Sequence, residues 1–149
     1  MGFIGANSNL SGASDVALSA PADNHVLSYN SATSKWRNAV LNDIISNITG
    51  ASGATTLNLA IANVFNVNLT AAVTFSFAGA VNGTSSSFGL HITQGSGGNY
   101  SVSWPASVKW PDGTAPTLST QAGSTDILVF ESINGGTTWF GSFVGANYS

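Results

Sequence analysis

The sequence has no cysteine, very little charge and no long apolar run. Among its 149 residues there is no Cys, which excludes disulfides and thiolate metal ligands. Three Lys and Arg stand against six Asp and Glu, and a net charge of −3 cannot provide the basic stripe that nucleic-acid binding requires. No segment approaches the ~18 apolar residues of a membrane span, so neither nucleic acid nor membrane is expected as a partner.

Neutral polar residues stand where charges are normally found. Charged residues make up 6% of the chain, whereas ordinary soluble domains carry about 25%. Hydrophobic residues reach 43%, which is enough for a core, and the remainder is rich in Ser, Thr, Asn and Gly. A surface of this kind forms hydrogen bonds but repels its neighbours weakly, which suits a protein that touches other copies or another protein.

The chain from about residue 57 onward has the period-2 pattern of β-strands. Turn signals at 81–87, 94–99, 110–116 and 134–136 separate the apolar runs, and Asn82-Gly83 predicts a hairpin. Residues 46–56 are small and polar, as in a linker or wide turn. This pattern predicts an all-β fold, an antiparallel, jelly-roll-like β-sandwich over 46–149. The alternation is clearest at Leu57, Leu59, Ile61, Phe65, Val67, Leu69, Val73, Phe75 and Phe77.

Residues 1–45 predict an extended arm with a small hairpin at 25–41. Tyr29 and Trp36 are expected to face each other near its Ser-rich loop. An isolated hairpin is marginal in water, so the arm is expected to become ordered against sister chains or a larger partner. The alternative is a floppy tail. The candidate interface residues are Val26, Leu27, Tyr29, Trp36 and Arg37.

No arrangement of reactive side chains predicts catalysis or metal binding. Asp126 and Glu131 are five residues apart on one strand, an odd offset that places them on opposite faces. Asp23, His25 and Ser28 resemble a triad only superficially, since nothing in the arm would exclude water. His91 has no second ligand beside it. No nucleotide fingerprint occurs, so no enzyme activity, metal or cofactor is expected.

The aromatic residues of the second part have two open interpretations. Trp104 and Trp139 continue the buried alternation, which favours packing. Alternatively, Tyr100, Trp110 and Asp112, together with the loop "QGSGGN" (94–99), form a glycan-binding surface. Trp110 precedes a Pro-Asp-Gly turn and is the tryptophan expected to be exposed.

Three segments resemble bacteriophage tail-fibre and minor structural proteins. "PADNHVLSYNSATSKWRN" (21–38) is similar to a hairpin that recurs in them. The pattern W-P-x-x-V-x-W-x-x-G-x-x-P and a following D-x-x-x-F-x-x-x-[DN]-G-G-T-T-W-[YF]-G segment are similar to their C-terminal β-domain. The matching residues are Trp104, Pro105, Val108, Trp110, Gly113 and Pro116, then Asp126, Phe130, Gly135, Gly136, Trp139 and Gly141.

This resemblance implies a non-enzymatic, trimeric virion protein that is assembled in the host cytoplasm. The chain is much shorter than a tail fibre, which favours a homotrimeric capsid decoration (cement) protein bound to the major capsid protein. The alternative is a tail-fibre or tail-tip protein, which has tail proteins as partners and recognises host surface glycans.

Overall fold

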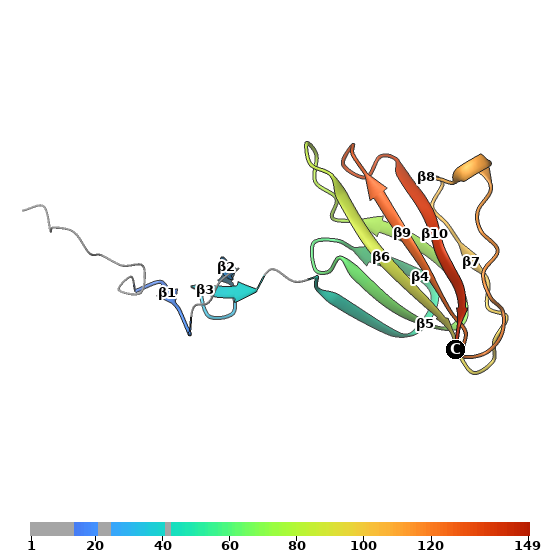
Figure 1. Ribbon diagram of the computed structural model, residues 1–149, viewed down its shortest axis with the longest axis horizontal. Coiled ribbons are helices and arrows are strands. Elements are labelled where there is room, and N and C mark those ends of the chain that lie inside the picture. The colour runs from blue at the N-terminus through green and yellow to red at the C-terminus, as the bar shows by residue number, and fades with distance from the viewer. Residues whose placement is uncertain (1–13, 21–24, 41–42) are drawn as a thin grey trace, which may run out of the picture. The chain divides into compact units, whose positions relative to one another are not determined.

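A computed structural model describes residues 14–20, 25–40 and 43–149, and these residues form β-strands and no α-helix. They group into two compact units, one within residues 1–42 and one spanning 43–149. Figure 1 shows both units. The all-β class expected from the sequence is confirmed. Asp23 and Leu41 lie outside the described residues.

The N-terminal unit is a three-stranded sheet in the order β1-β3-β2. Its strands are β1 (Val16–Ala17), β2 (His25–Asn30) and β3 (Lys35–Val40). The antiparallel pairing of β2 and β3 confirms the predicted hairpin, and Tyr29 lies opposite Trp36 as expected. β1 pairs in parallel with β3, so part of the stretch before the hairpin also belongs to the sheet.

The unit at 43–149 contains one seven-stranded sheet that bends around its own core. Along it the order is β4-β5-β6-β9-β10-β8, while β7 pairs with β5 off this path. A short 3-10 turn, η2, spans Pro111–Gly113. The strands are β4 (Ile45–Asn58), β5 (Val64–Ala78), β6 (Ser86–Gln94), β7 (Val102–Ser103), β8 (Val108–Lys109), β9 (Thr125–Ser132) and β10 (Trp139–Tyr148).

Two layers arise because the long strands β4 and β5 bend. The first part of β5 pairs with β6, whereas Val73 and Thr74 pair with β7. In β4 the register shifts between Ile48 and Gly53, close to Gly50 with φ 74°. Such a φ suits glycine, and two register shifts let the strand turn from one layer to the other. Because the period-2 pattern continues through the bend, both halves of β5 present their apolar side chains to one core.

Aromatic side chains fill one end of this core. Phe88 lies 4.9 Å from both Phe77 and Phe130 between ring centroids, and 5.4 Å from Trp139. Trp139 is the first residue of β10, so the aromatic run near the C-terminus supplies core to the sandwich. The buried hydrophobic residues are Ala51, Leu57, Ala62, Phe65, Val67, Leu69, Val73, Phe75, Phe88, Leu90, Ile92, Val108, Leu128, Phe130 and Trp139.

Strand direction differs from the antiparallel, jelly-roll-like expectation in the first half of this unit. β4–β5, β5–β6 and β5–β7 are parallel pairs, and antiparallel pairing is found in β6–β9 and β9–β10. The Asn82-Gly83 turn therefore joins parallel neighbours, and the hairpin predicted there is wrong. The linker predicted at 46–56 is also wrong, because these residues lie within β4. Period 2 reports which face of a strand is buried and carries no information on its direction.

Candidate assembly surfaces and pockets

The first candidate surface is an apolar face of the N-terminal sheet, made of Leu27, Tyr29 and Trp36. Leu27 and Tyr29 are two residues apart on β2, and Trp36 is the cross-strand partner of Tyr29, so all three side chains lie on one face. The Tyr29 and Trp36 rings meet edge to face with centroids 5.3 Å apart. Even so, Leu27 is 45% exposed, Tyr29 53% and Trp36 42%. The described residues therefore leave about half of this apolar face exposed.

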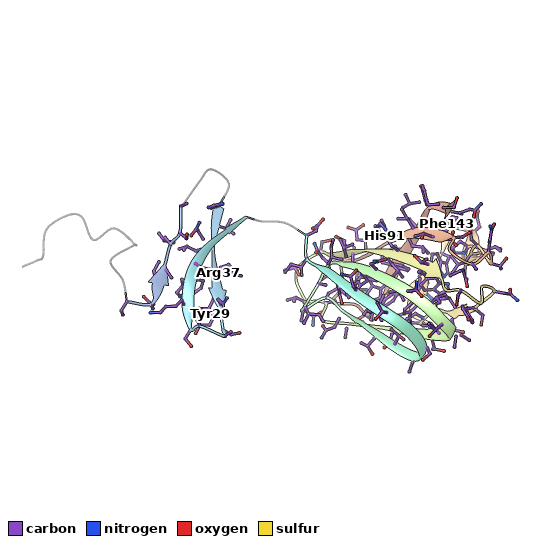
Figure 2. The ribbon with its side chains drawn as sticks, turned by 90° about the horizontal axis from the view of Figure 1, so that it is seen from below. Tyr29, Arg37, His91 and Phe143 are labelled. Atoms are coloured by element: carbon purple, nitrogen blue, oxygen red, sulfur yellow. The ribbon has the colours of Figure 1, made fainter. Side chains whose placement is uncertain are left out.

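The five predicted interface residues divide between the two faces of that sheet. Val26 and Arg37 alternate with the members of the apolar face and are themselves exposed. Lys35 lies on this second face and donates a hydrogen bond from Nζ to the carbonyl oxygen of Ser14. Tyr29 and Arg37, one from each face, are labelled in Figure 2. One face is therefore aromatic, whereas the other carries the positive charge of the unit.

His25 contacts the side chain of Asn38 across the hairpin. Its Nδ1 lies 2.8 Å from Nδ2 of Asn38, an amide. The same Asn38 side chain also donates to the carbonyl of Ser19 and accepts from its N–H. Asn38 thus ties the segment after β1 to the hairpin, which is a structural role.

The second candidate surface is the outer edge of β4. In the described part of the chain β4 pairs only with β5, so the other side of a 14-residue strand is unpaired. Exposed edge strands are commonly protected by Lys, Pro or short length. The residues of β4 include neither a charge nor a proline, and Ile45 at its start is 60% exposed. The edge is thus open to pairing with another chain.

A pocket of about 200 Å³ lies between residues 99–104 and 116–120. Tyr100 and Trp104 provide aromatic walls, and the residues that line it include no charged side chain. One ring of Trp104 stacks on Phe75 with centroids 5.6 Å apart. The lining consists of Asn99, Tyr100, Ser101, Val102, Trp104, Pro116, Leu118, Ser119 and Thr120.

Two buried polar side chains hold the walls of this pocket in place. Gln94 and Asp126 are each 2% exposed. Nε2 of Gln94 donates to the carbonyls of Tyr100 and Ser119, at 3.0 and 2.9 Å. Asp126 accepts from both the N–H and the hydroxyl of Ser119, and also from the N–H of Asn147. Residues 94, 119, 126 and 147 thereby form one hydrogen-bonded network.

The structure separates the three residues of the predicted glycan surface. Tyr100 lines the pocket just described, whereas Trp110 lines a different one of about 280 Å³ with Lys109 and Phe140. The tryptophan expected to be exposed is in fact half-buried, with its ring 5.2 Å from that of Trp104. Asp112 is exposed in η2 and lines neither of these two pockets.

Most of the residues that line this pocket were not predicted as site residues from the sequence, among them Trp104, Leu118 and Ser119. Trp104 was assigned to the core by its alternation, yet it both packs on Phe75 and lines the pocket. Leu118 and Ser119 lie in a loop that has no alternation of apolar and polar residues. They are recognised as pocket residues only because the fold places them beside Tyr100. The buried polar Gln94 was the one available signal, since its side chain must find partners nearby.

The carboxylates and His91 are placed as the alternation predicted. Asp126 is buried, while Glu131 is exposed and accepts a hydrogen bond from Ser85 at 3.2 Å. His91 is half-buried on the face opposite Leu90 and Ile92, with Asn66 and Ile127 as cross-strand neighbours. Figure 2 labels His91 within the 43–149 unit. Among the described residues no group of three or more His, Cys, Asp or Glu is placed to hold a metal ion.

The described residues contain no helix that is long and apolar enough to cross a membrane. Comparison of the chain with protein-family models, with curated proteins and with solved structures gave no match.

Proposed function

We propose that this chain is a non-enzymatic bacteriophage virion protein that assembles as a homotrimer and binds the outside of the capsid as a decoration protein. The observation that carries the proposal is the uncovered apolar face of Leu27, Tyr29 and Trp36. In the described residues of this three-stranded sheet no second layer buries these side chains, and their exposed apolar surface favours contact with another surface.

The energetics favour docking of this face. Each of its side chains is about half exposed, and covering one contributes on the order of 1 kcal/mol of burial free energy. Three such side chains in each of three arms give a sizeable total when they dock together. The partner is the major capsid protein, and a ligand that binds only the assembled shell stabilises it by mass action.

The outer edge of β4 and the low charge support self-association. An unpaired, uncharged strand of 14 residues can pair with a sister chain, and closed symmetry about a three-fold axis removes such exposed edges. With charged residues at 6%, few charges would have to be desolvated in the contact. The trimer is testable by sedimentation equilibrium of the purified chain.

The test of the docking role is incorporation of Trp36→Ala into particles of the phage that encodes the chain. Truncating Trp36 removes on the order of 1 kcal/mol or more of burial free energy at each of the three docked arms, so the variant should be depleted from purified particles. Phe140→Ala is the matched control, because Phe140 is an aromatic residue 53% exposed in the other unit. Equal incorporation of Trp36→Ala and the intact chain would mean that the N-terminal sheet has no docking role.

A tail location is the second candidate function, favoured by the aromatic pocket of Tyr100 and Trp104. In that case the chain is a tail-fibre or tail-tip protein, partnered by tail proteins, that recognises host surface glycans. Quantitative gels of purified particles separate the two. Copies in numbers comparable with the major capsid protein support decoration, whereas a few copies that co-purify with isolated tails support the tail location.

A further inference from the structure

The pocket between residues 99–104 and 116–120 combines aromatic walls with neutral hydrogen-bonding groups. The Trp104 ring stacks on Phe75, so one face of the Trp104 ring packs against the core. Asn99 and Thr120 are exposed at the pocket, and their side chains can both donate and accept. The hydroxyl of Ser119 donates to Asp126, which leaves its lone pairs to accept.

Hydrogen bonds already join the two segments that form the pocket walls when no ligand is bound. The N–H of Asn99 donates to the carbonyl of Thr120 at 2.6 Å, which joins the two segments directly. Gln94 bridges the carbonyls of Tyr100 and Ser119 from below, and its Oε1 accepts from the N–H of Tyr100 at 2.9 Å. A site held in this way loses little conformational entropy when it is filled.

The absence of charge in the lining restricts the ligand class. None of the residues that line the pocket carries a charge, and Lys109 of the same unit lines the other pocket. Phosphates, sulfates and acidic sugars would therefore meet no cation in the pocket lining. At about 200 Å³ the pocket is smaller than the ~300–1,000 Å³ typical of drug-sized ligands, so it suits one small ring.

We propose that this pocket binds a single neutral pyranose unit. The ring has an apolar C–H face that can pack on Trp104 or Tyr100, and it has equatorial hydroxyls that can bond with Asn99, Ser119 and Thr120. This binding site is independent of the N-terminal apolar face. It places sugar recognition at Tyr100 and Trp104, away from Trp110 and Asp112.

The experiment is saturation-transfer-difference NMR on the full chain with methyl glycosides of glucose, galactose, mannose and N-acetylglucosamine. N-acetylneuraminic acid serves as the acidic comparison. We expect weak binding of at least one neutral glycoside and none of the acidic sugar. Free monosaccharides are tested separately from oligosaccharides that end in the same sugar. Binding of the oligosaccharides indicates recognition of the end of a glycan, whereas binding of the monosaccharides alone indicates a soluble sugar.

Two variants locate the site. Asn99→Gly removes the amide and keeps the positive φ of 56° at that residue, and we expect an affinity lower by about tenfold, as for loss of one hydrogen bond. Asp112→Gly is the matched control, since Asp112 has a φ of 54° and lies outside the pocket. Thr120→Val is a second test of the same site in case Asn99→Gly unfolds. It removes the Thr120 hydroxyl, retains the backbone carbonyl that accepts from Asn99, and should also weaken sugar binding. The proposal is wrong if no neutral glycoside binds, if the acidic sugar binds better, or if only Asp112→Gly weakens binding.

Discussion

Two aromatic pairs, one in each unit, have nearly the same geometry and opposite surroundings. The rings of Tyr29 and Trp36 are 5.3 Å apart, and those of Phe88 and Trp139 are 5.4 Å apart. Tyr29 and Trp36 are 53% and 42% exposed, whereas Phe88 and Trp139 are 2% and 1% exposed. A contact between two aromatic rings is therefore not sufficient to bury them in a hydrophobic core.

The difference lies in the second layer. In the 43–149 unit, β4 and β5 bend and bring their own second halves over the first, so both sides of Phe88 meet protein. The described residues of the N-terminal sheet form three strands and no such layer. The described residues of this unit leave its aromatic pair about half exposed, and this exposure is the physical basis of the docking proposal.

The largest expected effect comes from truncating one tryptophan in each unit of the full chain. Trp139→Ala should lower the free energy of unfolding of the 43–149 unit by about 3–5 kcal/mol, because a large cavity replaces a buried side chain. Trp36→Ala should leave that transition unchanged within about 0.5 kcal/mol, since Trp36 belongs to the other unit. Urea denaturation followed by far-UV circular dichroism measures both. Equal losses would show that the two units do not unfold independently.

An intermediate effect is expected at the buried carboxylate. Asp126→Asn presents an amide NH₂ to at least one of the three donor groups that Asp126 accepts from, namely the Ser119 N–H and hydroxyl and the Asn147 N–H. We expect a loss of about 1–3 kcal/mol in the free energy of unfolding. Glu131→Gln is the matched control on the exposed face of the same strand, and it should change stability by less than about 0.5 kcal/mol. If Glu131→Gln lowered the free energy of unfolding as much as Asp126→Asn does, the stabilising role of the Asp126 hydrogen-bond network would be contradicted.

The sequence predicted what depends on local alternation. The hairpin at 25–41, the opposition of Tyr29 and Trp36, and the opposite faces of Asp126 and Glu131 all follow from period 2 and turn residues. The parallel pairing of β4, β5 and β6 did not follow, because it depends on which distant strands become neighbours once β5 bends. The pocket was missed for a related reason: Ser119 reaches Tyr100 through Gln94, and no sequence spacing encodes that contact.

The smallest expected change in stability is the sharpest test of self-association. Ala54 is exposed on β4, whose outer edge is unpaired, whereas Thr74 is exposed on β5 between Ala54 of β4 and Ser103 of β7. Lysine at either position should alter the free energy of unfolding by no more than about 0.5 kcal/mol. Three β4 edges that pair with sister chains would nonetheless be blocked by Ala54→Lys, because a charge on an edge strand opposes pairing. Sedimentation equilibrium should then show a weaker trimer for Ala54→Lys and an intact one for Thr74→Lys. If both variants associate as the unaltered chain does, the β4 edge is not the contact, and the trimer must be sought on another face.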